Sequence, residues 1–222
     1  MKNGIQALKV CGMTQKEQIR QLIDLNVDFI GFIFYERSLR FVLNSLTLAD
    51  IQSIDHPGKT GVFVNESVEK VMEVAEKAGL TMIQLHGDED QTYICGLRRL
   101  AGHKIKIMKA VRIGLQDVVS KEQHSEEISE QVRAVQNDVD YILFDTDSKG
   151  YGGTGKRFDW NLLDNLDIPI PYFLSGGISG DNISGLNTIS HKPFAIDINS
   201  KFERSPGDKD IEKIKKFKNQ IC

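Results

Sequence analysis

Polar side chains stand at the ends of several short apolar segments, where groups of different chemistry could act on one substrate. They are Lys9, Cys11, Asn65, Gln84, His86, Asp145 and Asp197. A thiol, an imidazole and a carboxyl can each take up or release a proton, and such groups perform general acid–base catalysis. Whether they meet depends on the fold that carries them.

Eight apolar runs of strand length alternate with helical patterns along the chain. They lie at 8–11, 29–34, 60–64, 82–87, 105–111, 141–145, 170–176 and 194–198. Repeated strand–helix units predict a parallel sheet, and α/β barrels often use about 200–250 residues as one unit. The 222 residues therefore favour an α/β fold, a closed (β/α)8 TIM barrel that forms one domain over residues 1–222. The competitor is an open doubly wound sheet, although no G-x-G-x-x-G follows the first run.

Local signals indicate some of the helix ends. Thr14 and Glu17 form a T-x-x-E pattern, which is typical of a capping box. Apolar residues repeat at helical spacing over 68–78, and Gly79 follows at the position of a C-terminal cap. The polar segment 112–139 predicts an exposed helix with a loop.

Strand parity predicts which side chains face the barrel interior, because successive residues of a strand point to opposite faces. One face of a barrel strand packs on helices, and the other ends at the active-site mouth. The side chains expected to face helices are Leu8, Val10, Val62, Val64, Ile83, Leu85, Ile142, Phe144, Phe194, Ile196 and Ile198. The polar set named above then points inward, joined by Lys109 if Met108 and Ala110 face the helices. A purely structural interior is filled mainly by Val, Ile and Leu, so this convergence predicts an enzyme.

Two loops are suited to bind a phosphate group. Residues 175–178 (SGGI) follow the seventh run, and paired glycines let backbone N–H groups approach an anion closely. Residues 197–201 (DINSK) follow the eighth run and could open a short helix whose N-terminus attracts phosphate. Barrel enzymes often bind phosphate between these loops, although SGGI alone is also compatible with a tight turn. The glycine-rich segment 150–155 indicates either a lid over Asp145 or a plain loop.

Composition excludes several classes of function. The net charge of −3 lacks the basic excess of nucleic-acid-binding proteins. No apolar run approaches the roughly 20 residues of a membrane helix, and no signal-peptide core opens the chain. Cys11, Cys95 and Cys222 are too widely spaced for a disulfide framework or a metal site. We therefore expect a cytoplasmic protein without a metal ion and without nucleic-acid or membrane partners.

The chain resembles phosphoribosylanthranilate isomerase from about residue 8 to its C-terminus. The motifs that carry the resemblance are KVCGMT at 9–14, GFIFYERSLR at 31–40, GVFVN at 61–65, QLHG at 84–87, FDT and GGTGKRFDW within 144–160, SGGI at 175–178 and DINS at 197–200. The resemblance implies an Amadori rearrangement in tryptophan biosynthesis. N-(5-phosphoribosyl)anthranilate becomes 1-(2-carboxyphenylamino)-1-deoxyribulose 5-phosphate, without a metal or organic cofactor.

The resemblance also implies roles for individual residues. Asp145 is the expected general acid, Cys11 the general base, and Arg40 the clamp for the anthranilate carboxylate, with Arg37 as the alternative. Arg40, Asn65, Gln84, His86 and Asp197 are the expected substrate-binding residues. His86 is expected to be a hydrogen-bonded wall residue, and Asp197 to support the site by pairing with Lys9. The expected phosphate-binding residues are Gly153, Gly155, Gly176, Gly177, Asn199 and Ser200. The family commonly has D-V-S-S-G-V-E after the eighth strand, whereas this chain has Asn199 for the first serine and Lys201 for the glycine.

Two other functions compete with this interpretation. A sugar-phosphate isomerase of the histidine pathway would use paired aspartates, one of them at the position of Cys11. A non-catalytic binder of phosphorylated metabolites would not need both Cys11 and Asp145. Cys95 and Cys222 are expected to be non-catalytic. The pattern is compatible with either a monomer or a weak homodimer.

Overall fold

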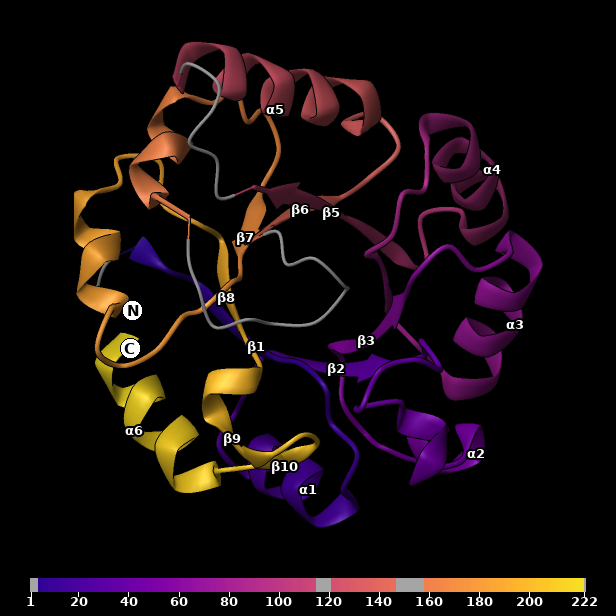
Figure 1. Ribbon diagram of the computed structural model, residues 1–222. Coiled ribbons are helices and arrows are strands. Elements are labelled where there is room, and N and C mark those ends of the chain that lie inside the picture. Colours follow the sequence, from indigo (N-terminus) through magenta and orange to yellow (C-terminus); the bar gives the residue numbers. More distant parts are fainter. Residues whose placement is uncertain (1–3, 115–120, 147–157, 222) are drawn as a thin grey trace.

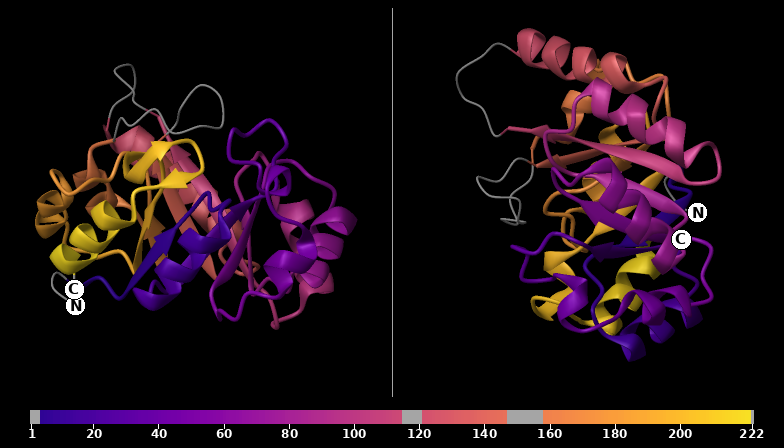
Figure 2. Two further views of the ribbon diagram at one scale, coloured as in Figure 1. Left: turned by 90° about the horizontal axis from the view of Figure 1, so that it is seen from below. Right: turned by 90° about the vertical axis from the view of Figure 1, so that its right-hand side faces the viewer.

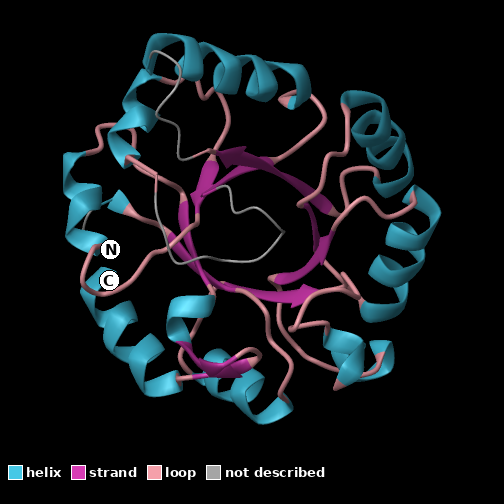
Figure 3. Ribbon diagram, viewed as in Figure 1, coloured by secondary structure: helices cyan, strands magenta, loops and turns pink. Residues whose placement is uncertain are grey.

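The chain forms a closed barrel of eight parallel strands surrounded by helices (Figure 1, Figure 3). The computed structural model describes residues 4–114, 121–146 and 158–221. Within these residues the barrel strands are β1 (Ala7–Val10), β2 (Phe29–Ile33), β3 (Lys59–Phe63), β4 (Met82–Leu85), β5 (Lys106–Ile113), β6 (Tyr141–Thr146), β7 (Tyr172–Leu174) and β8 (Ala195–Ile198). Each strand pairs with its neighbour in sequence, and β8 closes on β1 with Lys9 opposite Asp197. The barrel prediction is confirmed, and an open doubly wound sheet is excluded.

Helices follow the strands and form the outer layer. The α-helices of the described residues are α1 (Lys16–Asp24), α2 (Leu48–Gln52), α3 (Val68–Ala78), α4 (Gln91–Ala101), α5 (Lys121–Val135) and α6 (Ile211–Ile221). Short 3-10 helices are η2 (Val42–Asn44), η3 (Trp160–Asn165), η4 (Ile183–Thr188) and η5 (Ser200–Phe202). After β8 the chain also forms a small hairpin of β9 (Glu203–Ser205) and β10 (Asp208–Lys209), which lies at one end of the barrel (Figure 2).

The predicted capping box at Thr14 is wrong. Helix α1 begins after Gln15, without a side-chain cap, and the Thr14 hydroxyl instead donates to the carbonyl of Gly207 at 2.8 Å. A capping box does form at Thr47 and Asp50, before α2. Thr14 therefore ties the loop after β1 to the β9–β10 hairpin.

Two other helix predictions are confirmed. Gly79 ends α3 with a φ of 61°, which a side chain would adopt only with strain. Helix α5 lies within the polar segment 112–139, but it is not exposed all round, since Ile128 and Val132 are buried against the barrel.

The core has two apolar layers. The larger one lies between strands and helices and holds Leu8, Val10, Ile83, Leu85, Ile142, Phe144, Ile196 and Ile198, as parity predicted. The smaller one fills the barrel interior with Ala7, Met82, Met108, Ala110, Leu143, Phe173 and Ala195. Phe194 also packs on this inner layer, against the ring of Phe173, so its predicted outward position is wrong.

Strand β5 is the other correction to the predicted parity. Met108 and Ala110 point inward, so Lys109 points outward and does not join the polar set. Its ammonium donates to the carbonyl of Gly87 at 2.7 Å and to Glu89 at 2.9 Å. The lysine is buried because these acceptors in the β4–α4 loop satisfy its charge.

Candidate active site

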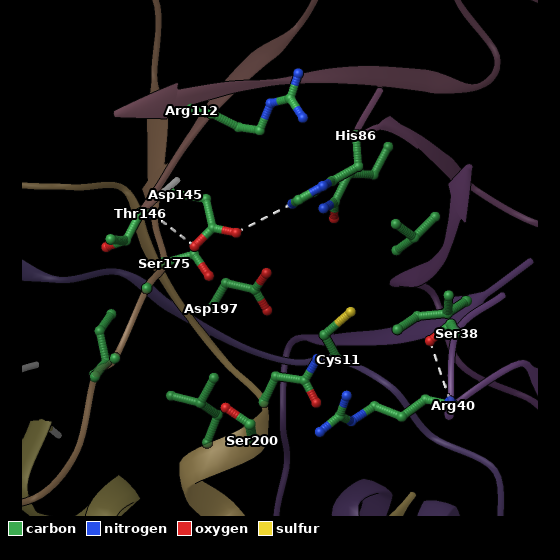
Figure 4. A pocket seen from close by; sticks show the side chains of 18 of the residues that line it. Cys11, Ser38, Arg40, His86, Arg112, Asp145, Thr146, Ser175, Asp197 and Ser200 are labelled. Carbon is green, nitrogen blue, oxygen red and sulfur yellow. Dashed lines mark hydrogen bonds and ion pairs between the residues drawn. The ribbon is translucent and has the colours of Figure 1, made fainter. Parts of the chain in front are cut away.

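A cavity lies at the carboxyl ends of the barrel strands, where polar side chains from several strands converge (Figure 4). Its lining includes most of the residues singled out from the sequence. They are Cys11, Arg40, Gln84, His86, Asp145, Gly176, Gly177, Asp197, Asn199 and Ser200. Figure 4 shows Cys11, Arg40, His86, Asp145 and Asp197 directed toward a common space.

Three of the expected substrate-binding and phosphate-binding residues are not among them. Asn65 is exposed, and its side chain oxygen accepts from the N–H of Asp88 at 2.6 Å, so its predicted inward position is wrong. The reason lies in β3, where Phe63 packs in the outer layer while Val62 and Val64 line the cavity, opposite to the predicted parity. Gly153 and Gly155, together with the rest of the glycine-rich segment, lie outside the described residues.

Cys11 stands directly after β1 with its side chain in the cavity wall. Its backbone N–H donates to the carbonyl of Ile198 at 2.9 Å, which extends the β1–β8 pairing to this residue. Gly31 of β2 leaves room for the thiol, because a Cβ at that position would lie 2.8 Å from Sγ. The rigid strand and the missing neighbouring side chain together set the position of the sulfur.

Lys9 and Asp197 form a buried ion pair beneath Cys11. Lys9 Nζ lies 2.9 Å from Asp197 Oδ2, and the lysine side chain is fully buried. Burial alone would lower the pKa of Lys9, but the charges of Asp197 and Cys11 and the hydrogen bonds to them together outweigh it, so the pKa lies above its ordinary value. Burial raises the pKa of the Cys11 thiol; Lys9 opposes this rise and Asp197 adds to it. Cys11 therefore rests as a thiol, with a cation nearby that favours its thiolate.

Asp145, at the end of β6, is held from two sides. The backbone N–H of Thr146 donates to Oδ1 at 2.9 Å, and His86 Nε2 lies 3.2 Å from Oδ2. His86 comes from the end of β4, and it is a hydrogen-bonded wall residue as expected. These two contacts fix the carboxyl plane, which is the geometry a general acid needs toward a bound substrate.

Two buried oxygens in the cavity wall have no hydrogen-bond partner among the described residues. They are Oε1 of Gln84 and Oδ1 of Asp197. A buried polar atom without a partner is costly, by about 1–3 kcal/mol. Burial also raises the pKa of Asp197, against the opposing charge of Lys9. Both oxygens are suited to accept hydrogen bonds from the hydroxyl groups of a ligand.

Arg40 reaches the cavity from the loop after β2, while Arg37 is exposed and does not line it. The guanidinium is already bound on one edge. Nε lies 2.9 Å from both carboxylate oxygens of Glu203, and Nη2 lies 2.6 Å from Oε2. An anion that binds Arg40 from the cavity must therefore approach the remaining edge of the guanidinium, which carries Nη1.

The two loops predicted to bind phosphate line the same cavity. Gly176 and Gly177 follow β7 with φ angles of 90° and 67°. A Cβ on Gly176 would lie 2.3 Å from the hydroxyl oxygen of Thr146, so the backbone there is open only to glycine. Asn199 and Ser200 follow β8, and the predicted short helix is the 3-10 turn η5, which begins at Ser200.

The sequence interpretation missed several groups at the cavity. Arg112 lines it at the end of β5, where Ile107, Val111 and Ile113 face outward and parity could have shown it. Glu203 and Lys209, which lie behind Arg40, carry no local signal, because only the β9–β10 hairpin brings them to the barrel. Tyr35, Ser38 and Ile178 also line the cavity.

Neither a metal centre nor a membrane span is found in the described part of the chain. In residues 4–114, 121–146 and 158–221, no three His, Cys, Asp or Glu side chains are grouped so that they could hold a metal ion. None of the helices in those ranges has the length and apolar character required to cross a membrane.

Comparison with known proteins points to one family. Residues 8–220 match the family model described as N-(5'phosphoribosyl)anthranilate (PRA) isomerase. An N-(5'-phosphoribosyl)anthranilate isomerase of Parabacteroides distasonis is 42% identical, over 96% of this chain and 92% of the relative. One of Caldanaerobacter subterraneus is 38% identical, over 96% of this chain and 97% of the relative.

Solved structures agree with the sequence relatives. The phosphoribosyl anthranilate isomerase of Thermotoga maritima superposes with a TM-score of 0.75 at 32% identity, covering 98% of each chain. A second structure, a phosphoribosyl anthranilate isomerase in complex with reduced 1-(o-carboxyphenylamino)-1-deoxyribulose 5-phosphate, gives a TM-score of 0.70 at 31% identity. It covers 96% of each chain.

Proposed function

The chain belongs to the N-(5'-phosphoribosyl)anthranilate isomerases, enzymes of tryptophan biosynthesis, and from this premise we propose how its own residues perform the reaction. The substrate is N-(5'-phosphoribosyl)anthranilate and the product is 1-(2-carboxyphenylamino)-1-deoxyribulose 5-phosphate. The observation that carries the proposal is the shared cavity of Cys11 and Asp145, between two loops suited to a phosphate group.

Asp145 acts first, as the general acid. It donates a proton to the furanose ring oxygen while the bond from that oxygen to C1 breaks, which leaves a protonated Schiff base between C1 and the anthranilate nitrogen. The contacts from Thr146 N–H and His86 hold the carboxyl group in place for this transfer. Proton transfer by a positioned group typically contributes about 10²–10⁴-fold to the rate.

Cys11 acts second, as the general base. The positive Schiff base withdraws electrons and acidifies the hydrogen on C2. The thiolate of Cys11 takes that proton, and the electron pair of the C–H bond forms the C1–C2 double bond of an enolamine. The enolamine then tautomerises to the ketone. Because burial raises the pKa of this thiol, the charge of Lys9 contributes to catalysis by favouring the thiolate.

The remaining residues bind the substrate. The unpartnered oxygens of Gln84 and Asp197 accept hydrogen bonds from ribose hydroxyls, with His86 beside them. The phosphate lies between the loops that carry Gly176, Gly177, Asn199 and Ser200, and Gly153 and Gly155 are assigned to the same group from sequence alone. Arg40 binds the anthranilate carboxylate.

The rearrangement moves hydrogen atoms within one molecule and consumes no oxidant or reductant, so the mechanism calls for no redox cofactor. We further propose that residues 1–222 act as a single domain, in the cytoplasm, as a monomer or weak homodimer. The ligand is a small molecule, and neither a nucleic acid nor a membrane is a proposed partner.

Genetic complementation tests the proposed function. A strain that requires tryptophan because it lacks this isomerase is expected to grow without tryptophan when it carries the present chain. The same strain carrying Cys11→Ala at equal expression is expected to fail. No growth with the unaltered chain, despite soluble expression, would exclude the activity.

A further inference from the structure

Glu203 and Lys209 are buried behind Arg40, at the outer ends of the β9–β10 hairpin. The Glu203 side chain is 3% exposed and that of Lys209 is 0% exposed. Lys209 Nζ lies 2.7 Å from Glu203 Oε1 and 2.7 Å from Asn199 Oδ1. Two charged side chains are seldom so deeply buried without a partner or a function.

Glu203 determines which edge of the Arg40 guanidinium faces the cavity. A guanidinium offers a side edge, formed by Nε and Nη2, and an end edge, formed by Nη1 and Nη2. Glu203 occupies the side edge with both of its oxygens. Among the described residues the guanidinium bonds only through Nε and Nη2, and Nη1 has no hydrogen-bond partner there. The end edge can therefore take a second carboxylate in the two-point geometry that arginine favours.

Lys209 gives the cluster of Arg40, Glu203 and Lys209 its positive charge. Arg40 and Glu203 alone would form a neutral pair, which attracts an incoming anion only weakly. Burial lowers the pKa of Lys209, and the charge of Glu203 opposes this fall. The Lys209 ammonium, donating to two acceptors at 2.7 Å, gives the three-residue group a net charge of +1. No solvent reaches this ammonium, so its field is screened less than that of a surface lysine.

Lys209 also determines the orientation of the Asn199 amide. A lysine can only donate hydrogen bonds, so the atom facing it must be the amide oxygen. The NH₂ group of Asn199 is then the remaining, donating end of a side chain that lines the cavity. Asn199 stands where the family commonly has serine, and this orientation preserves a donor at that position.

We propose that Glu203 and Lys209 are positioning residues for the aryl carboxylate of the substrate, acting through Arg40. Glu203 presents the end edge of the guanidinium, and Lys209 supplies the charge that makes this edge attractive to an anion. The inference rests on the proposed function, since it needs a ligand that carries both a phosphate and an aryl carboxylate.

The test compares two stable ligands that differ in one group. They are 1-(2-carboxyphenylamino)-1-deoxyribitol 5-phosphate and 1-phenylamino-1-deoxyribitol 5-phosphate, with Kd measured by calorimetry. The readout is the ratio of the two Kd values, which reports on the carboxylate alone. Lys209→Met is expected to reduce the preference for the carboxylated ligand about tenfold, equivalent to about 1.4 kcal/mol. Lys209→Arg keeps the charge and is expected to retain most of the preference.

Glu203→Gln separates positioning from charge. This variant adds a positive charge to the group, so charge alone predicts a stronger preference for the carboxylated ligand. Loss of the two-oxygen contact predicts the reverse, because the guanidinium is then free to turn. The proposal therefore expects a weaker preference in Glu203→Gln as well as in Lys209→Met.

A matched control exists at the opposite end of the strands. Arg98, Asp140 and Lys106 form the same kind of triad, with Asp140 lying 2.5 Å from Arg98 and 2.8 Å from Lys106. Lys106→Met is expected to leave the Kd ratio unchanged. An unchanged ratio in both Lys209→Met and Glu203→Gln, or equal weakening of both ligands, overturns the proposal. Failure of the unaltered protein to bind either ligand would instead contradict the proposed function.

Discussion

Lys9 and Asp197 face each other across the seam where β8 closes on β1, and their side chains form a buried ion pair at 2.9 Å. The pair belongs to two strands that are 188 residues apart in sequence. It lies next to Cys11 and contributes to the electrostatics of the thiol, so one contact serves both the closure of the barrel and the chemistry.

Asp197→Ala is expected to destabilise the protein strongly. The substitution leaves the Lys9 ammonium buried without its partner, which typically costs about 3–5 kcal/mol. Urea denaturation measures the free energy of unfolding. The double variant Lys9→Met with Asp197→Leu removes both charges and is expected to recover most of that loss. Equal instability of the single and double variants would show that the pair is not the cause.

The pH dependence of catalysis follows from the raised pKa of Cys11. A raised pKa means that the thiol keeps its proton to higher pH, so kcat/KM is expected to rise with pH beyond the ordinary thiol value of about 8.5. Lys9→Met removes the cation that lowers this pKa and is expected to shift the rising limb to still higher pH. Cys95→Ala is the control and is expected to leave the limb in place. A limb that levels off near pH 6 would contradict the assignment.

Gly31→Ala is expected to reduce kcat by displacing the thiol. The added Cβ would lie 2.8 Å from Cys11 Sγ and 3.0 Å from Cys11 Cα, so the sulfur cannot stay in place. Gly96→Ala provides the control, since a Cβ there meets no atom within 4 Å and helix α4 favours alanine. Steady-state kinetics on both variants, with circular dichroism to verify folding, makes the comparison. Wild-type kcat in Gly31→Ala would show that the thiol position is unimportant.

Arg40→Ala is expected to raise KM, because the substrate carboxylate loses its cation. Arg37→Ala is expected to have no such effect, since Arg37 is exposed and lies outside the cavity lining. The two variants remove the same charge from the same loop, so any difference reflects position alone. If Arg37→Ala raises KM and Arg40→Ala does not, the roles of the two arginines are reversed.

Strand parity predicted most of the barrel correctly, because apolar residues alternate clearly in β1, β4, β6 and most of β8. Asp145 and His86 could be placed in the cavity for that reason. Parity failed in β3 and β5, where residues of similar polarity occupy both faces. In β5 a lysine is buried on the helix side by Glu89, a carboxylate that no local pattern connects with it.

The contacts of Arg40 could not be predicted from the sequence, because its partner is distant along the chain. Glu203 lies 163 residues further along the chain and is brought to Arg40 by a two-stranded hairpin outside the barrel repeat. Thr14 similarly looks like a helix cap in sequence but binds Gly207 of that hairpin. A tertiary contact of this kind overrides a local capping signal, because the side-chain hydroxyl that would cap the helix is already used in the contact.

The central claim is that Cys11 and Asp145 transfer protons to and from one bound sugar. Single-turnover kinetics of Cys11→Ala and Asp145→Asn, together with Kd for the carboxylated ribitol phosphate, measure chemistry and binding separately. The turnover of each variant is expected to fall by about 10²–10⁴-fold or more, while its Kd for the ligand changes little. Near-normal turnover in either variant would contradict the account.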